Sequence, residues 1–401
     1  MNAKVLYTLG ELLNKLLPFL LLPYLTRKLG VDDFSFLVVM ESYIALYMLF
    51  VNFGQDSLVL KSCHRFRETF VASVFANIYK WFALSAFILL CLTLIYSGEL
   101  SLNMFFVILI ALLANIYLVK LVYLQSKQQV KHYLQFQFVN LFVATLCTII
   151  VFEFVEPKVE FRLGSIVIGF LVVFSFMYIV PSTKAPRNNK KFKKTILKYQ
   201  ILAGFPLLIH QGSFFLKSKA DKIILADYPD SIAFSNFSLA SMISLMIPLI
   251  CAAIYRAEVP IIYQKLKRKK KRVVNYKINV VMIIGILLAA TIAYILPESF
   301  YLYIFGDGFE KVRYYLPFNI LVYCFYPIYL YVHNVSIYFD LGIKIITSAL
   351  VSALISVAIL ISIWKFTFDL RTVNISILLS SVVSIFIMYP QIKEKIKKND
   401  S

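Results

Sequence analysis

The chain has 401 residues, of which 60% are hydrophobic and 15% charged, and its mean hydropathy is +0.79. Soluble domains are nearer half apolar and a quarter charged, so a soluble globular fold is excluded and lipid is the expected solvent. The net charge of +20 comes from short basic runs between apolar stretches, a pattern that indicates cytoplasmic loops and excludes a nucleic-acid-binding role.

In chain order, twelve apolar stretches are long enough to cross a bilayer, whose core requires about 20 helical residues. They predict transmembrane helices at Val5–Leu25, Phe34–Leu58, Phe70–Tyr96, Leu102–Leu124, Leu134–Phe154, Leu163–Val180, Tyr199–Leu216, Ile232–Tyr255, Ile278–Leu296, Tyr315–Tyr338, Ile345–Phe366 and Val373–Tyr389. The first stretch contains Glu11, Asn14 and Lys15 and lacks a small-residue cleavage site, so it predicts a membrane helix and not a signal peptide.

Lysine and arginine counts in the loops predict the orientation. With the N-terminus in the cytoplasm, cytoplasmic segments carry about 26 of these residues and the opposite loops about 10. An even number of helices returns the C-terminus to the same side. The densest basic run, 265–272, is interpreted as a topology determinant on anionic headgroups, with capture of an anionic lipid substrate as the alternative.

The basic loop 181–198 lies near the midpoint and divides the helices six plus six. We therefore predict an all-α integral membrane fold of about 12 helices in two lobes, 1–185 and 186–401, related by a pseudo-two-fold. A weak internal echo supports this division, because charged helix ends and acidic turns follow both the first and the seventh helix. The longest loops leave no room for a soluble catalytic domain, so we do not expect an enzyme.

Five cysteines and four histidines indicate neither a disulfide framework nor a metal site. Four of the cysteines lie in apolar runs, where cysteine behaves as a small hydrophobe. The sequence contains no CxxC spacing and no HExxH motif.

Ionisable residues within the helices are the candidates for a functional site, because a charge at membrane depth costs roughly 2.5–3.5 kcal/mol or more. Glu11 and Lys15 share a helix face, which indicates either a local ion pair or a polar cavity. Lys80 lies deep in its helix and is a cavity candidate, whereas Lys120 can extend to the headgroups. The other candidates are Glu41, Lys217, Lys219, Asp221, Lys222, Arg256 and Glu258.

Prolines and serines mark further features of the predicted helices. Pro18, Pro23 and Pro206 are expected to bend the first helix of each half. Serines recur every fourth residue in the last two helices, at Ser348, Ser352, Ser356, Ser376, Ser380 and Ser384. This spacing favours close helix packing over a role in lining a cavity.

Several motifs together resemble a known family. They are Pro23–Gly30 (PYLTRKLG), the stretches 52–56 (NFGQD), 122–127 (VYLQSK), 204–206 (GFP) and 221–225 (DKIIL), and 304–309 (IFGDGF). Their order and spacing are similar to those of bacterial polysaccharide-repeat flippases, the O-antigen (Wzx-type) exporters of the multidrug/oligosaccharidyl-lipid/polysaccharide superfamily. The resemblance covers essentially the whole chain.

The resemblance implies a two-lobed inner-membrane transporter that works by alternating access on an undecaprenyl-diphosphate-linked oligosaccharide. It implies substrate-binding cations, for which Lys15, Lys80, Lys217, Lys219 and Lys222 are the candidates. Glu11, Glu41 and Asp221 are expected to tune these cations or to carry coupling protons. No cofactor is expected beyond a coupling ion, H⁺ or Na⁺. The expected partners are membrane lipid, a polysaccharide polymerase and a chain-length regulator.

Three alternatives remain at this point. An O-antigen polymerase would be expected to carry a large external loop with arginines, and the external loops here are short. A cation-coupled exporter of small molecules from the same superfamily is the second alternative, and a membrane receptor or scaffold without transport is the third.

Overall fold

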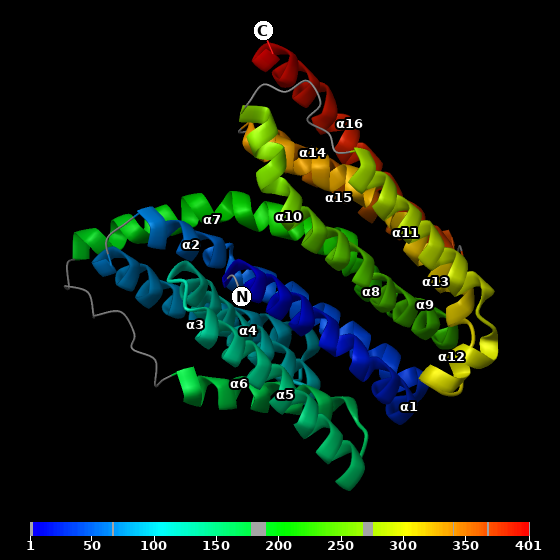
Figure 1. Cartoon of the computed structure of the whole chain (residues 1–401). Coiled ribbons are helices and arrows are strands. Elements are labelled where there is room, and N and C mark those ends of the chain that lie inside the picture. The colour runs from blue at the N-terminus through cyan, green and yellow to red at the C-terminus, as the bar shows by residue number, and fades with distance from the viewer. Residues whose placement is uncertain are drawn as a thin grey trace. The chain divides into compact units, whose positions relative to one another are not determined.

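The computed structural model describes residues 3–65, 68–177, 190–267, 276–339, 341–366 and 369–400, and all regular elements in these ranges are helices (Figure 1). They are α1 Ala3–Asn52, α2 Gln55–Arg65, α3 Glu68–Ser97, α4 Leu102–Ser126, α5 Val130–Phe154, α6 Val159–Met177, α7 Lys190–Ser218, α8 Ala220–Ile224, α9 Ser231–Ser244, α10 Met246–Lys267, α11 Tyr276–Ile295, α12 Glu298–Phe305, α13 Val312–Leu321, η1 Val322–Phe325, α14 Tyr326–Tyr338, α15 Gly342–Phe366, η2 Leu370–Thr372 and α16 Val373–Asp400.

Ten stretches of the described chain are long and apolar enough to cross a membrane, which confirms the all-α membrane class. The first of them, Pro18–Asn52, contains parts of two predicted spans, because α1 consists of two helices merged across a kink. The seventh predicted span lies in α7 and is not among the ten, since Gln200, His210 and Gln211 lower its hydropathy. The twelve predicted spans thus all correspond to helices.

Backbone breaks fall at places that the apolar runs did not predict. The kink in α1 lies at Gly30, where φ is 70° and ψ is −172°, and not at Pro18 or Pro23, which the helix accommodates. The second predicted span was expected to continue to Leu58, but α1 ends at Asn52 and a turn follows. The signal for this turn was the short stretch 52–56, in which Asn52, Gln55 and Asp56 are polar and Gly54 favours a turn, and the prediction was wrong because it continued the apolar run across these residues.

The described residues form two compact units. The N-terminal unit comprises Met1–Leu21 and Phe36–Gly212, and the C-terminal unit comprises Leu22–Ser35 and Ser213–Ser401. The middle of α1, Leu22–Ser35, therefore belongs to the C-terminal unit, and most of α7 belongs to the N-terminal unit. The predicted lobe boundary between residues 185 and 186 stays a prediction.

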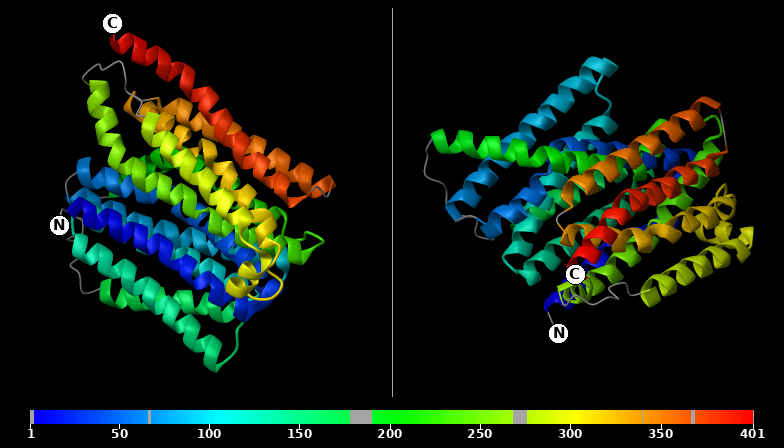
Figure 2. Two further views of the ribbon diagram at one scale, coloured as in Figure 1. Left: turned by 45° about the vertical axis from the view of Figure 1, so that its right-hand side comes forward. Right: turned by 90° about the horizontal axis from the view of Figure 1, so that it is seen from above.

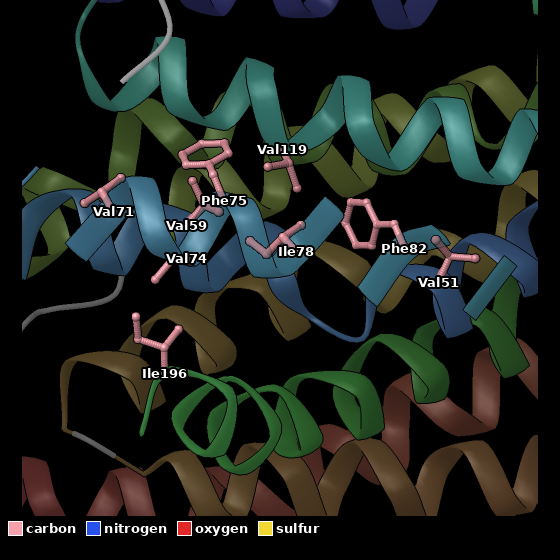
Figure 3. Packing of buried hydrophobic residues seen from close by; sticks show 9 residues of the cluster. All are labelled: Val51, Val59, Val71, Val74, Phe75, Ile78, Phe82, Val119 and Ile196. Carbon is pink, nitrogen blue, oxygen red and sulfur yellow. The ribbon is translucent and has the colours of Figure 1, made fainter. Parts of the chain in front are cut away.

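A hydrophobic cluster forms the core of the N-terminal unit (Figure 3). Its side chains come from α1, α2, α3, α4 and α7, so helices distant in sequence share one interior. The members are Val51, Val59, Val71, Val74, Phe75, Ile78, Phe82, Val119 and Ile196. Partly buried aromatic residues, including Trp81 and Tyr123, pack around it.

The turn between α1 and α2 packs against α7 with no room for another carbon atom. Phe53 and Gly54 both have positive φ, at 49° and 71°. A Cβ added to Gly54 would lie 2.6 Å from Leu207 Cβ, and one added to Gly204 would lie 2.6 Å from the Phe53 carbonyl oxygen. Two of the motifs that carry the resemblance, 52–56 and 204–206, therefore meet here.

A second pair of motifs meets in the C-terminal unit. Arg27, in the segment Leu22–Ser35, donates a hydrogen bond from Nη2 to the Tyr303 carbonyl oxygen, and its guanidinium lies 5.9 Å from the centroid of the Tyr303 ring. The rings of Phe34 and Phe309 meet edge to face with centroids 5.6 Å apart. The segment is thus held at both ends.

Gly308 packs against the same segment between the Arg27 and Phe34 contacts. Its φ is 85°, and an added Cβ would lie 2.5 Å from Val31 Cγ2. Asn236 Nδ2 donates a hydrogen bond of 2.7 Å to the Gly308 carbonyl oxygen. Only glycine satisfies both the left-handed backbone and the close approach of Val31.

The helices α15 and α16 lie side by side (Figure 2). All six serines of the stripes are buried. Ser356 Oγ donates a hydrogen bond of 3.3 Å across the interface to the Ser376 carbonyl oxygen. The prediction that these serines mediate close helix packing is confirmed, because small residues let the two backbones approach.

Candidate functional site

The strongest candidate site lies in the C-terminal unit on the short helix α8. The helix α7 ends at Ser218, and Lys219 adopts a non-helical N-cap conformation before α8 begins. The next helical turn places Asp221 and Lys222 in the interior, 4% and 6% exposed. They are the two buried charged side chains of the part that the structure describes.

Asp221 and Lys222 form a hydrogen-bonded ion pair with each other, between Oδ2 and Nζ. Lys222 Nζ also lies 5.4 Å from the centroid of the Phe237 ring, on α9, within range of a cation–π interaction. The Phe237 ring in turn meets the Tyr315 ring on α13, with centroids 5.8 Å apart. One aromatic ring therefore borders the pair, and a second ring packs behind it.

The pair is only partly satisfied. Asp221 Oδ1 has no hydrogen-bond partner among the described residues. Burying two charges costs several kcal/mol per ion even after relaxation, and their mutual attraction offsets this only when the remaining hydrogen bonds are made. An incompletely paired charge in a membrane protein therefore points to function more than to stability.

The other predicted site residues are dispersed. Lys217 and Lys219 lie half-buried immediately before α8, close to the pair in sequence. Lys80, on α3 in the N-terminal unit, is exposed and forms no ion pair with the described residues. Glu41 lies half-buried in the same unit. The side chains of Glu11, Lys15 and Arg256 lie outside the described part, and Glu258, on α10, is half-buried.

Arg162 is a candidate that the sequence did not identify, because loop counting assigned it to an external loop. It lies four residues into α6, where Nη1 donates a hydrogen bond of 2.8 Å to Thr148 Oγ1 on α5. Its Nε has no partner in the described residues, and Glu41 interacts with it electrostatically. The signal available in the sequence was the position of Arg162, directly before an apolar run.

Asparagines form a second polar group in the C-terminal unit that sequence reasoning missed. Asn374 Nδ2, on α16, lies 2.6 Å from Asn319 Oδ1 on α13. Asn319 in turn bonds to Ser241 Oγ, on α9, at 3.0 Å. The unit thus holds three helices together through amides and a hydroxyl, which indicates a polar interior shielded from lipid.

Comparison with known proteins places the chain in a family. Residues 3–266 match the sequence profile of the polysaccharide biosynthesis protein family. A protein of the Lsg locus of Haemophilus influenzae is 27% identical over 362 residues, which covers 89% of this chain and 90% of the relative. A second membrane protein of that organism is 27% identical over 317 residues, or 78% of this chain and 77% of the relative.

Solved structures share the fold. The lipid II flippase MurJ in its inward closed conformation gives a TM-score of 0.66 at 15% identity, covering 99% of this chain and 90% of that one. An inward-facing multidrug resistance transporter of the MATE family, within the MOP superfamily, gives 0.59 at 13% identity, covering 95% of both chains. The all-α membrane fold and the resemblance found in the sequence are both confirmed, and the chain belongs to the polysaccharide biosynthesis protein family.

Proposed function

We propose that this protein flips an undecaprenyl-diphosphate-linked oligosaccharide, an O-antigen or related repeat unit, from the cytoplasmic to the periplasmic face of the bacterial inner membrane. Alternating access between the two sides would move the diphosphate and sugars while the lipid tail stays in the bilayer. The family match and the fold shared with a lipid II flippase support this function. The buried Asp221–Lys222 pair is the single observation that carries it.

The chemistry of the proposed substrate requires such a group. A diphosphate cannot enter hydrocarbon unaided, because the idealised cost of burying one ion is of order 20 kcal/mol. Lys222 is a cation already placed away from water, and Asp221 neutralises it while no substrate is bound. An arriving diphosphate would compete with Asp221 for the ammonium group, and a displaced Asp221 would favour taking up a proton or Na⁺.

The other charged residues have supporting roles in this proposal. Lys15, Lys80, Lys217 and Lys219 would guide the diphosphate to and from Lys222. Glu11 and Glu41 would tune these cations or take part in ion coupling. The distribution of basic residues among the loops supports a cytoplasmic location for both termini in this proposal. A polymerase and a chain-length regulator would act on the delivered repeat unit.

Deletion of the gene in its own host tests this function. The expected result is an accumulation of single undecaprenyl-linked repeats on the cytoplasmic face, where they are protected from an external glycosidase in intact spheroplasts. Re-expression of the wild-type chain should clear them. Single repeats that have already been transferred to the outside would instead indicate a polymerase, and an unchanged lipid-linked pool would refute the proposal.

A further inference from the structure

A row of aromatic rings follows one face of η1 and α14 in the C-terminal unit. The residues are spaced three, three and four apart, as neighbours on one helix face are. The ring centroids of Tyr323 and Tyr326 are 6.2 Å apart, those of Tyr326 and Tyr329 are 5.8 Å apart, and those of Tyr329 and His333 are 5.6 Å apart. We call these four residues the aromatic ladder.

The ladder is less buried than the opposite face of the helix. Its four members are half-buried, whereas Tyr331, Val332 and Val335 are buried. Two of the rings, Tyr329 and His333, are nearly parallel, with an interplanar angle of 25°. Ten residues separate the ends of the ladder, which corresponds to a length of about 15 Å at the rise of a helix.

The depth of the ladder argues against an ordinary lipid-facing role. Tyrosines that anchor a helix lie in belts at the two membrane interfaces. Tyr323, Tyr326 and Tyr329 instead fall in the middle third of the span Val312–Tyr338. Phenol hydroxyls facing hydrocarbon there would lack hydrogen-bond partners, at a cost of several kcal/mol each, so this face requires polar surroundings.

The ladder adjoins the candidate site in the same unit. The Phe237 ring, whose centroid lies 5.4 Å from Lys222 Nζ, meets the Tyr315 ring on α13 with centroids 5.8 Å apart, and α13 leads directly into η1 and the ladder. The Asp221–Lys222 pair and the four aromatic rings therefore lie on neighbouring elements. A sugar diphosphate presents complementary groups, an anion and rings.

We propose that the aromatic ladder is the binding track for the sugar rings of the substrate, with the diphosphate at Lys222. The apolar C–H face of a pyranose ring packs on an aromatic face, and the tyrosine hydroxyls can bond to the sugar hydroxyls at its edge. Because every pyranose has such a face, the track would accept repeat units of differing composition. This inference rests on the proposed function and adds to it the part of the protein that holds the glycan.

Two synthetic ligands separate the sugar from the diphosphate. The full chain in lipid nanodiscs would be titrated with farnesyl diphosphate and with farnesyl-diphosphate-linked N-acetylglucosamine. For the wild type, the glycosylated ligand should bind more tightly. The variant Tyr326→Ala/Tyr329→Ala should lose about tenfold of this sugar-dependent gain and still bind farnesyl diphosphate normally.

Matched variants guard against misfolding. Tyr326→Phe/Tyr329→Phe keeps the rings and should keep most of the gain. Tyr338→Ala removes a tyrosine from the end of the same helix, outside the ladder, and should behave as the wild type. A sugar-dependent gain that is absent from the wild type, or unchanged in the double alanine variant, would overturn the ladder proposal alone. A wild type that binds neither ligand would overturn the proposed function itself.

Discussion

The two units of the molecule differ in the kinds of residues that they bury. The N-terminal unit is built around a hydrophobic cluster from five helices. The C-terminal unit holds the buried Asp221–Lys222 pair, the Asn319–Asn374 contact and the serine stripes. Polar groups inside lipid are expensive, so their greater number in the C-terminal unit is the main difference between the two interiors. In the proposed function, the N-terminal unit would serve as a scaffold and the C-terminal unit would hold the diphosphate.

Substitutions at the Asp221–Lys222 ion pair are expected to have the largest effect, because this pair distinguishes the C-terminal unit most clearly from the N-terminal unit. Lys222→Met leaves Asp221 buried without its partner and should destabilise the C-terminal unit by about 3–5 kcal/mol, with loss of glycan export. Asp221→Leu/Lys222→Met removes both charges and should recover most of the thermal stability without recovering export. Melting temperature and surface polysaccharide are the two measurements.

Lys344→Met is the matched control for the ion pair, because Lys344 is exposed at the start of α15. It should change neither stability nor export. Full export by the double variant would show that the pair is structural and would remove it from the candidate site.

The next effect tests the packing of the segment Leu22–Ser35 in the C-terminal unit. Gly308→Ala must place a Cβ 2.5 Å from Val31 Cγ2 at a φ of 85°. Strain and overpacking together should cost about 2–5 kcal/mol. Gly98→Ala, at a φ of 71° with nothing within 4 Å, should show the backbone strain alone. Equal losses of stability in the two variants would refute the tight contact.

Replacing a tightly packed glycine in the N-terminal unit should cause a similar but smaller loss of stability. Gly204→Ala would bring a Cβ to 2.6 Å from the Phe53 carbonyl oxygen and should cost about 1–3 kcal/mol. Gly164→Ala, whose nearest contact would be an ordinary 3.7 Å to Phe106, should be neutral or slightly stabilising because alanine favours the helix. Thermal unfolding of both variants measures the difference. A Gly204→Ala variant as stable as the wild type would contradict the packing.

The smallest effect is a pH dependence at the loop before α16. Burial acts to raise the pKa of Asp369, but hydrogen bonds from Arg371 outweigh it and hold this pKa below its ordinary value of 3.8. Asp369 therefore contributes stability that is present above about pH 4 and is lost as the pH falls through the folded-state pKa. Asp369→Asn should flatten the acid side of the stability curve slightly. An unchanged acid side would show that the contact contributes nothing.

More of the fold than of the candidate site could be predicted from the sequence. Apolar runs locate helices well, because backbone N–H and C=O groups inside lipid must form hydrogen bonds with each other, and a helix provides all of these bonds. They do not reveal the break at Asn52, because an average over a whole span conceals the short polar stretch 52–56. Asp221 and Lys222 were identifiable as charges beside an apolar run. Arg162 carried the same signal but was missed, because counting charges by loop does not distinguish a loop residue from one in the first turn of a helix.

The aromatic ladder shows the same limit in another form. Its tyrosines were visible in the sequence, but a stripe of aromatic residues at helical spacing is as typical of a packed core as of a binding surface. Which side is packed depends on neighbours from distant parts of the chain, here α10 and α16. That information lies in tertiary packing and not in the local pattern.

The contact between Arg27 and Tyr303 also has a consequence for biosynthesis. The two residues are 276 positions apart. At about 5–20 residues per second, a ribosome needs tens of seconds to reach Tyr303 after it has made Arg27. Throughout that interval, the first helix has entered the membrane without the loop that will hold it. The C-terminal unit can be completed only when a segment made early joins one that is made 276 residues later.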